Sequence, residues 1–379
     1  MLIHTVAPGE TLFSLAQRYG VSVPSLAETN GLSAEQPLAV GQALLIPYPP
    51  GETGRTRRRK IKTGGYAYSF ADRGVLRSAL PFMTYLWIFS YGFTEEGELI
   101  GTDDASLIAL ARSYGTAPLL VLTTITESGH FSSERAEKLL RSPAMRETLL
   151  TRLLRVMREK GYAGLDVDFE YVPVDLAGEY ADFLRYAADL CHKEGFLFTT
   201  VAAPKTSAEQ QGLLYEAHDY PVLGSLADTL FLMTYEWGYT YGPPMAVAPL
   251  RQVSQVAAYA VTEVPPQKLL LGIPNYGYDW NLPYIAGTQA RSIGNEYAVR
   301  LAADRRAVIE FDEGAASPFF YYSEGEQAHV VWFEDVRSIE RKFDLADRLG
   351  LAGVGYWNLQ RPFAQNYALL AARYEIEKL

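Results

Sequence analysis

Residues 164–171 read Gly164-Leu165-Asp166-Val167-Asp168-Phe169-Glu170-Tyr171. Side chains alternate along a β-strand, so the three acidic residues of this stretch share one face, with neighbours about 7 Å apart. The apolar residues between them face the other way. Burial of like charges costs free energy, and at least one of the three carboxyl groups must keep its proton. A stabilising role does not explain such a row, which therefore predicts a strand that carries a functional site.

Seven further apolar, strand-like runs accompany this one along the chain. They occupy residues 66–70, 85–89, 119–125, 196–202, 229–235, 269–274 and 353–357. Amphipathic helical stretches, such as 133–160 and 176–194, lie between them. Near-continuous apolar strands that alternate with helices predict an α/β protein with a parallel (β/α)8 TIM barrel. Glu170 then lies at the carboxyl end of the fourth strand, where the active sites of such barrels lie.

The stretch between the seventh and eighth strands is too long for a simple loop. It contains strand-like runs at residues 308–311, 319–322 and 329–333. We therefore expect a small α+β insertion after strand seven, at about residues 278–333.

The composition excludes several classes of function. The chain has 379 residues and a formal charge of −10, which argues against nucleic acid as the main partner. The single cysteine excludes an internal disulfide framework and a cysteine-rich zinc site. No stretch approaches the roughly 18 apolar residues that span a bilayer. The 26 tyrosines, 17 phenylalanines and 5 tryptophans suit an enzyme that stacks on sugars, although large cores also use aromatic residues.

The first 48 residues have a pattern of their own, with two short helices between two short strands. This segment resembles a LysM module, a small βααβ domain. The matching residues include His4-Thr5-Val6, Gly9-Glu10-Thr11-Leu12, Asn30 and Leu45-Ile46-Pro47. LysM modules bind the N-acetyl-sugar backbone of peptidoglycan or chitin, so the resemblance implies that role for residues 1–48.

Residues 49–64 are expected to link the two domains. They are rich in proline, glycine and basic residues and show no apolar periodicity, which is typical of a linker. The basic residues could bind a polyanion such as a cell-wall polymer, or the segment could be a solvated spacer. The barrel domain then covers residues 65–379. The first residues lack the features of a secretory signal, so we expect synthesis in the cytoplasm without a cleaved signal peptide.

A metal site is one alternative interpretation of the acidic row, because clustered carboxylates can hold Mg²⁺ or Ca²⁺. A spacing of about 7 Å distributes the three groups along the strand, so they do not converge easily on one ion. Proton transfer explains a graded burial of carboxyl groups better. We therefore expect no metal ion at this row of carboxyl groups.

The acidic row resembles the D-G-x-D-x-D-x-E signature of family-18 glycoside hydrolases, which include the chitinases. Ala163 stands where the first Asp of that signature would be. Three further motifs match in order along the chain. They are Met233-Thr234-Tyr235-Glu236, with Glu in place of the family's Asp, then Gly272-Ile273-Pro274-Asn275-Tyr276-Gly277, and finally Gly355-Tyr356-Trp357.

The resemblance implies a substrate-assisted, retaining hydrolysis, in which the sugar's own acetamido group replaces the second carboxylate. Glu170 would protonate the glycosidic oxygen and later activate water. Asp168 would accept the acetamido N–H, and Asp166 would share a proton with Asp168. Tyr235 would donate its hydroxyl to the acetamido carbonyl oxygen, and Trp357 would form the apolar floor under the reacting sugar.

Five other residues are candidates for substrate contacts. Tyr171 follows the acid and either lines the site or simply packs. Met233 belongs to the strand-six motif, and Glu236 could bond sugar hydroxyls in place of the family's Asp. Asn275 and Tyr276 end strand seven at the catalytic face, where we expect them to contact substrate.

The run from Met233 to Pro244, joined to a LysM module, resembles the spore-cortex N-acetylglucosaminidases of spore-forming bacteria. That resemblance implies cleavage of β-1,4 bonds after N-acetylglucosamine in peptidoglycan fragments during germination, without a cofactor, and association with the spore coat or cortex. Two alternatives remain, a chitinase that acts on chito-oligosaccharides and a non-catalytic, sugar-binding barrel lectin. Lectin variants commonly lose the terminal acid of the signature, which this chain retains as Glu170.

Overall fold

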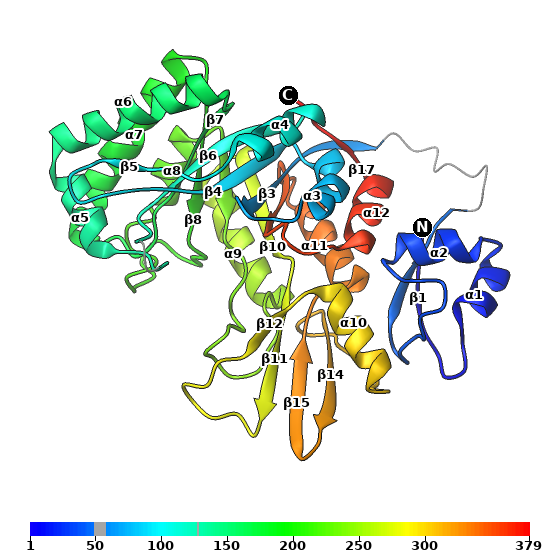
Figure 1. Cartoon of the computed structure of the whole chain (residues 1–379). Coiled ribbons are helices and arrows are strands. Elements are labelled where there is room, and N and C mark those ends of the chain that lie inside the picture. Colours follow the sequence, from blue (N-terminus) through cyan, green and yellow to red (C-terminus); the bar gives the residue numbers. More distant parts are fainter. Residues whose placement is uncertain (49–57, 127–128) are drawn as a thin grey trace.

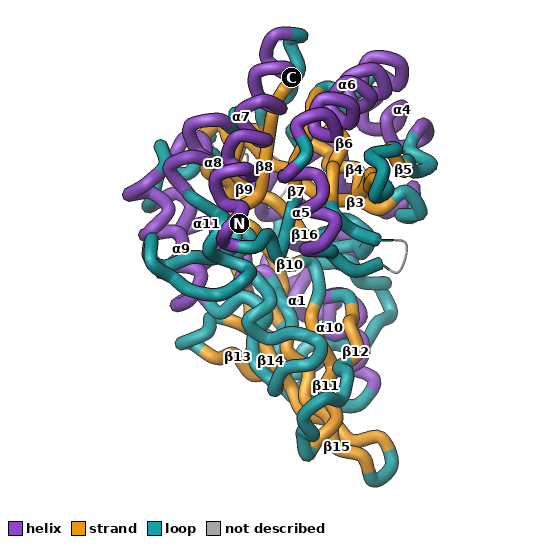
Figure 2. Tube along the Cα trace, turned by 90° about the vertical axis from the view of Figure 1, so that its left-hand side faces the viewer, coloured by secondary structure: helices purple, strands orange, loops and turns teal. Residues whose placement is uncertain are grey.

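The computed structural model describes residues 1–48, 58–126 and 129–379. Its centre is a closed barrel of eight parallel strands, in the order β3-β16-β10-β9-β8-β7-β6-β4, with β3 and β4 paired to close the ring (Figures 1 and 2). This confirms the predicted TIM barrel. The strands are β3 (Arg59–Tyr68), β4 (Tyr85–Phe93), β6 (Ala117–Thr123), β7 (Gly164–Asp168), β8 (Leu197–Ala202), β9 (Thr229–Leu232), β10 (Leu269–Pro274) and β16 (Gly353–Trp357).

Helices that connect the strands cover the outside of the barrel (Figure 2). They are α3 (Arg73–Ala79), α4 (Ala105–Ser113), α5 (Ser133–Arg141), α6 (Pro143–Lys160), α7 (Ala177–Lys193), α8 (Tyr220–Leu226), α9 (Leu250–Glu263), α11 (Val336–Arg348) and α12 (Ala364–Arg373). Short 3₁₀ turns occur at Leu80–Phe82, Val174–Leu176 and Pro266–Lys268. Two short strands lengthen the sheet, since β5 (Leu99–Ile100) pairs antiparallel with β4 and β17 (Tyr374–Ile376) pairs parallel with β3.

The single helical stretch expected at 133–160 is two helices, α5 and α6. Ser142 lies at the junction, and its hydroxyl accepts the backbone N–H of Met145 as the N-cap of α6. Pro143 follows at the first position of α6, where its missing N–H costs no helical bond. The apolar residues of α6, such as Leu149, Leu153 and Met157, recur at helical spacing and are buried against the barrel.

Large aromatic side chains fill the inside of the barrel. Tyr66 stacks on Trp87 with ring centroids 4.7 Å apart, and both contact Phe231. Glycines on neighbouring strands make the space for these rings, because a Cβ on Gly64 would lie 2.1 Å from the ring of Trp87. The interior is thus a packed core, as in other barrels of this kind.

The first barrel strand begins earlier than the sequence suggested. We expected a strand at 66–70 and a linker up to residue 64, whereas β3 begins at Arg59 and pairs with β16 and β17. Arg59 forms an ion pair of 2.8 Å with Asp347, so this basic end of the strand is bound to the barrel. Charged residues at an exposed strand end hide the apolar alternation, and this explains the error. The first part of the expected linker, residues 49–57, lies outside the described residues.

An insertion between β10 and α11 forms a second, smaller sheet on one side of the barrel (Figures 1 and 2). Its strands run in the order β12-β11-β15-β14-β13 and its helix is α10 (Asn295–Asp304). The strands are β11 (Gly277–Leu282), β12 (Arg291–Ile293), β13 (Glu310–Asp312), β14 (Ser317–Glu324) and β15 (Gln327–Trp332). The predicted α+β insertion after strand seven is confirmed.

The N-terminal residues form the expected βααβ domain, drawn in blue in Figure 1. β1 (Leu2–Thr5) pairs antiparallel with β2 (Ala43–Ile46), and α1 (Leu12–Tyr19) and α2 (Val23–Thr29) lie between them in sequence. The Thr11 hydroxyl caps α1 in a reciprocal pair of bonds with Ser14. Across the described parts of the chain, no helix is both long and apolar enough to cross a bilayer.

Candidate active site

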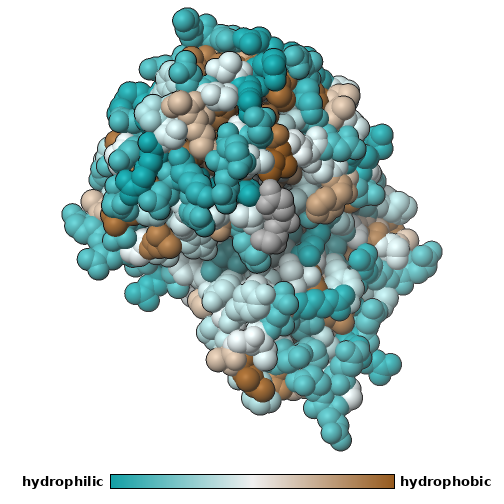
Figure 3. Space-filling view, turned by 60° about the vertical axis from the view of Figure 1, so that its left-hand side comes forward, coloured by the Kyte–Doolittle hydropathy of each residue, from teal (hydrophilic) through white to brown (hydrophobic). Residues whose placement is uncertain are grey.

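A cavity of about 460 Å³ opens at the carboxyl ends of the barrel strands. The surface in Figure 3 is hollowed between the barrel and the insertion, on a face that is mostly hydrophilic with scattered apolar residues. The residues that line the cavity are Tyr66, Phe131, Asp168, Glu170, Tyr171, Val201, Pro204, Leu214, Tyr215, Met233, Tyr235, Glu236, Trp237, Tyr239 and Trp357. Carboxyl groups and aromatic rings on one concave surface are what a sugar-binding site requires, since sugars combine hydroxyls with apolar faces.

Asp166 is the deepest of the three carboxyl groups on β7 and lies below the cavity. It is fully buried and accepts two hydroxyl donors, Tyr66 at 2.9 Å and Thr199 at 2.5 Å. Burial raises the pKa of Asp166 to about 6, although the two hydrogen bonds oppose that rise. Asp166 can therefore hold or release a proton near neutral pH without touching a ligand.

Asp168 is the middle carboxyl group and lines the cavity while it remains only 4% exposed. Burial raises its pKa well above the usual range, and the charges of Glu170 and Asp166 raise it further. Its Oδ1 is buried and accepts no hydrogen bond from any residue that the structure describes. A buried acceptor without a donor costs free energy, so Asp168 is prepared for a donor from a ligand.

Glu170 stands two residues beyond the end of β7, at the rim of the barrel. Burial raises the pKa of Glu170 to about 7, and the nearby charge of Glu236 contributes to the rise. A carboxyl group with such a pKa is protonated in a large fraction of molecules at neutral pH. It can then serve as a general acid and, once ionised, as a general base.

Tyr235 contributes a hydroxyl group to the lining of the cavity, and Trp357 contributes an apolar indole ring. Burial and the charges of Asp168 and Glu170 raise the pKa of Tyr235 well above its usual value, so its hydroxyl stays a donor. The indole of Trp357 is held by edge contacts with Phe89 and Tyr68, at centroid distances of 5.0 and 6.0 Å. Its position is thereby set before a ligand arrives.

Two residues of the cavity wall, Tyr171 and Glu236, adopt left-handed backbone conformations with φ of 57° and 67°. Non-glycine residues in this region cluster at functional sites, where the surrounding structure offsets the strain. The carboxylate of Glu236 accepts the hydroxyls of Tyr276 and Tyr278, the latter at 3.0 Å. Tyr276, which follows strand seven, and Tyr278, from the insertion, therefore fix the orientation of the Glu236 carboxylate.

A buried histidine joins the ends of two barrel strands beneath the site. The Nδ1 atom of His218 accepts the backbone N–H of Ala203, so its Nε2 carries the proton and donates to the carbonyl of Phe169. Burial lowers the pKa of His218 to about 4, which keeps the ring neutral. The residue before Glu170 is thus held in place.

The structure brings most of the predicted site residues to the cavity, but two of them stand apart. Those that line it are Asp168, Glu170, Tyr171, Met233, Tyr235, Glu236 and Trp357, with Asp166 directly below. Asn275 does not line the cavity, because its buried amide donates to the carbonyls of Asn358 and Arg361. Tyr276 is also buried, and it reaches the site through its bond to Glu236 and through the hydrophobic cluster that packs against Tyr235 and Trp357. Asn275 and Tyr276 are therefore not among the residues that line the cavity, and the direct substrate contact expected for them stays a prediction.

Several residues of the site lie outside the four family-18 motifs. Tyr66 comes from β3, and Phe131, Tyr215 and Tyr239 come from loops after three different strands. Tyr278 comes from the insertion and holds Glu236. The sequence offered one indication for Tyr66, namely its inward-facing place on the expected first strand. Tyr239 falls within the run from Met233 to Pro244, whereas Phe131 and Tyr215 belong to no motif and meet the site only in three dimensions.

A family model for glycosyl hydrolases family 18 matches residues 121–361, and a LysM domain model matches residues 4–47. A cortical fragment-lytic enzyme of Bacillus subtilis (strain 168) is 38% identical to this chain, and the match covers 100% of this chain and 99% of that protein. A putative sporulation-specific glycosylase of the same organism is 30% identical, over 100% of both chains.

The fold has close counterparts among solved structures. The crystal structure of the Bacillus cereus spore cortex-lytic enzyme SleL superposes with a TM-score of 0.82 and 35% identity, over 99% of this chain and 87% of that one. The four motifs, which lie on or directly after β7, β9, β10 and β16, fall within the residues that the family model matches.

Proposed function

Because this chain belongs to glycosyl hydrolase family 18 and carries a LysM domain, we propose that it hydrolyses β-1,4 bonds after N-acetylglucosamine in spore-cortex peptidoglycan fragments during germination. The chain is a glycoside hydrolase by family. The choice of cortex fragments is supported by its similarity to the cortical fragment-lytic enzyme of Bacillus subtilis. The LysM domain, residues 1–48, would hold the wall glycan while the barrel cleaves it.

The unpartnered Oδ1 of Asp168 is the observation that carries this proposal. It lies in the same cavity as the donor hydroxyl of Tyr235 and the raised-pKa carboxyl of Glu170. An acetamido group offers one N–H donor and one carbonyl acceptor, which complement Asp168 and Tyr235 respectively. Asp168 and Tyr235 together therefore favour a sugar with an acetamido group at carbon 2 over a sugar with a free hydroxyl at that carbon.

In the first step, protonated Glu170 donates its proton to the glycosidic oxygen as the bond from that oxygen to the anomeric carbon breaks. The acetamido carbonyl oxygen forms a new bond to the anomeric carbon and gives an oxazolinium ion. The proton that Asp166 and Asp168 share lies on Asp166 in this step, which leaves Asp168 ionised. Asp168 then accepts the N–H of the oxazolinium ion and stabilises its positive charge. Trp357 packs under the sugar ring.

In the second step, ionised Glu170 accepts a proton from water, and the water oxygen attacks the anomeric carbon. The bond to the acetamido oxygen breaks, and the acetamido group is restored. Two displacements at one carbon give a product with the configuration of the substrate. Glu170 ends protonated, ready for the next cycle, and neither step consumes a cofactor.

The substitution Glu170→Gln tests the role of the acid. Glutamine keeps the size of the side chain but cannot donate an acidic proton, so we expect turnover to fall by about 10²–10⁴-fold. Release of reducing ends from soluble muropeptides measures it, with thermal unfolding as the check that the variant folds. Turnover that survives this substitution contradicts the mechanism.

The products distinguish the proposed substrate from chitin. We expect cortex fragments to be cut into muropeptides that end in N-acetylglucosamine, as measured by mass spectrometry. Cleavage of chito-oligosaccharides alone supports the chitinase alternative, and binding of both without cleavage supports the lectin alternative. The anomeric proton of the first product, followed by NMR, checks retention of configuration.

We further propose that the chain is made in the cytoplasm and becomes associated with the spore coat or cortex. Its similarity to spore cortex-lytic enzymes supports this location. Fractionation of sporulating cells with an antibody to the chain measures it. Recovery in the culture medium during growth, with none in spores, contradicts it.

A further inference from the structure

The second strand of the LysM module is buried on both faces. Leu44 and Ile46 of β2 pack into the module's own core, whereas Ala43 and Leu45 pack into the main core of the barrel domain. All four residues are at most 4% exposed. Apolar residues on both faces are typical of a strand that has a packing partner on each side. The barrel domain thus provides half of the environment of this strand.

The loop before β2 fits closely against the insertion. Gly41 has φ of 81°, and a Cβ at this position would lie 1.9 Å from the carbonyl oxygen of Ile309. The backbone N–H of Ile309 donates to the carbonyl of Val40 at 2.8 Å. Ala39 packs in the hydrophobic cluster of the insertion, with Ile293 and Ala298. Only glycine permits this approach of the two backbones.

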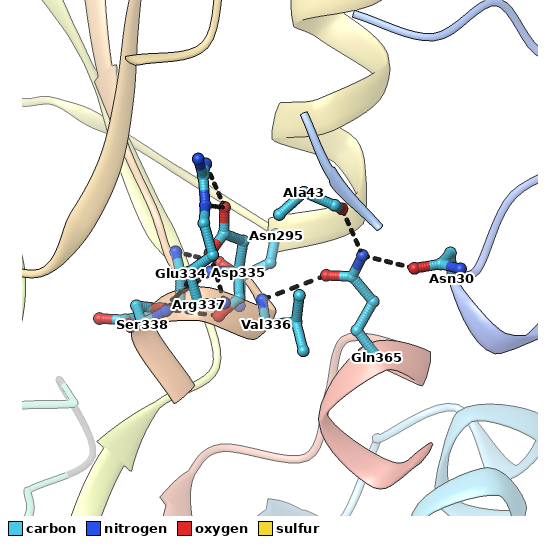
Figure 4. A network of polar contacts seen from close by, with 9 residues as sticks. All are labelled: Asn30, Ala43, Asn295, Glu334, Asp335, Val336, Arg337, Ser338 and Gln365. Atoms are coloured by element: carbon cyan, nitrogen blue, oxygen red, sulfur yellow. Dashed lines mark hydrogen bonds and ion pairs between the residues drawn. The ribbon is translucent and has the colours of Figure 1, made fainter. Parts of the chain in front are cut away.

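A buried glutamine of α12 joins the module to the barrel (Figure 4). The amide nitrogen of Gln365 donates to the Asn30 side-chain oxygen and to the carbonyl of Ala43, both at 2.8 Å. Its amide oxygen accepts the backbone N–H of Val336, at the start of α11, at 3.3 Å. Removal of this side chain would leave buried polar groups of both domains without partners, which is costly.

The other side of the insertion supports the wall of the active site. Tyr278 of β11 donates to Glu236, and the indole N–H of Trp280 donates to the carbonyl of Gly242 at 2.9 Å. The hydrophobic cluster of Tyr278 and Trp280 also packs against Tyr235 and Trp357. The insertion therefore lies between the LysM module and the residues that would contact the substrate.

We propose that the LysM module is a positioning element of the catalytic unit: its docking through Gly41, Val40 and Gln365 holds the insertion where β11 supports the substrate-binding wall. This inference rests on the proposed function, because its main readout is the turnover of a soluble glycan. A module that only tethered the enzyme to the wall would act through local concentration and would not influence such a substrate. The docked module would affect the turnover of a soluble substrate because it fixes the position of the insertion.

The substitution Gly41→Ala in the full chain tests the proposal. A methyl group at this position meets the Ile309 carbonyl, so the interface must open. The matched control is Gly20→Ala, which also places alanine at a positive φ, of 66°, but has no atom within 4 Å of the new Cβ. Hydrogen exchange at the amides of Ile309 and Val336 reports whether the interface is closed. We expect faster exchange in Gly41→Ala and not in Gly20→Ala.

The kinetic readout is the KM for a soluble muropeptide that cannot be pelleted. We expect KM to rise by about fivefold or more in Gly41→Ala, because a loosened wall binds the sugar less well. A variant that is merely less stable loses active molecules, which lowers kcat and leaves KM unchanged. If Gly41→Ala fails to fold, Gln365→Ala opens the same interface from the barrel side without strain in the module.

The proposal is overturned if the amide of Ile309 exchanges faster in Gly41→Ala while KM stays unchanged. It is also overturned if this amide already exchanges as an unprotected group in the unchanged chain. If instead the proposed function is wrong, the unchanged chain binds the muropeptide without cleaving it. In that case the same comparison is made on the Kd for the muropeptide, with the same expected rise.

Discussion

Asp166, Asp168 and Glu170 lie at decreasing depth along one strand, and each environment suits a different proton state. Asp166 accepts two hydroxyls and never contacts the cavity, whereas Asp168 has an oxygen without a donor. Glu170, at the rim, has a pKa of about 7. Three residues of nearly equal chemistry can thus take separate roles because their burial and their hydrogen-bond partners differ.

The pKa of Glu170 leads to a pH dependence. The acid acts only when protonated, so turnover should be high below pH 7 and fall as the pH rises through about 7. In Glu236→Gln the neighbouring negative charge is absent, which lowers the pKa of Glu170 and moves the midpoint of the fall to lower pH. The pH profile of kcat/KM measures the shift.

Two controls belong to this experiment. Glutamine at position 236 still offers an oxygen to Tyr276 and Tyr278, so the wall of the cavity should keep its shape. Glu170→Gln should leave no comparable fall with pH, because the titrating acid is gone. A midpoint that stays in place in Glu236→Gln would show that the charge of Glu236 does not act on Glu170.

At the scale of single elements, helix ends depend on particular side chains. Asp335 caps α11 by accepting the backbone N–H groups of Arg337 and Ser338, and the hydroxyl of Ser338 accepts the N–H of Asp335 in return. Asp335 is buried beside the interface drawn in Figure 4. A simpler cap occurs at α3, where the exposed side chain of Asp72 accepts the N–H of Val75 without a reciprocal bond among the described residues.

We therefore expect Asp335→Ala to lower the free energy of unfolding by about 2 kcal/mol and Asp72→Ala by about 1 kcal/mol. The difference arises because the first substitution removes the partner of the buried N–H of Ser338, of the partly buried N–H of Arg337 and of the Arg337 guanidinium. The second leaves one exposed N–H group that water can satisfy. Urea unfolding followed by circular dichroism measures both values. Equal losses would contradict the importance of burial at the α11 cap.

At the scale of the whole molecule, the LysM module and the barrel domain share buried surface and a polar network. Ala43 and Leu45 have their packing partners in the barrel domain, and Gln365 has hydrogen-bond partners in both domains. Cooperative unfolding follows when neither part can keep its core without the other. We expect one calorimetric transition for the full chain, and two in Gly41→Ala. Two separate transitions in the unchanged chain would contradict a shared core.

The sequence was sufficient to predict the barrel and several of the residues that line its cavity. Strand alternation placed Asp166, Asp168 and Glu170 on one face, and the strand-six and strand-eight motifs identified Tyr235 and Trp357. The shared face depends on strand periodicity, which the chain carries locally, whereas Tyr235 and Trp357 were indicated by the resemblance to family-18 motifs. The same reasoning misplaced the start of β3, because exposed charged residues there conceal the strand pattern.

Only the tertiary structure decided which residues meet at the cavity and how the domains are joined. The direction of Asn275 away from the site depends on carbonyl groups from the loop after β16, more than 80 positions along the chain. The docking of the LysM module depends on the fit of Gly41 to Ile309 and of Asn30 to Gln365. Such contacts join residues that are distant in sequence, so periodicity and local motifs determine the barrel and its acidic strand but not these contacts.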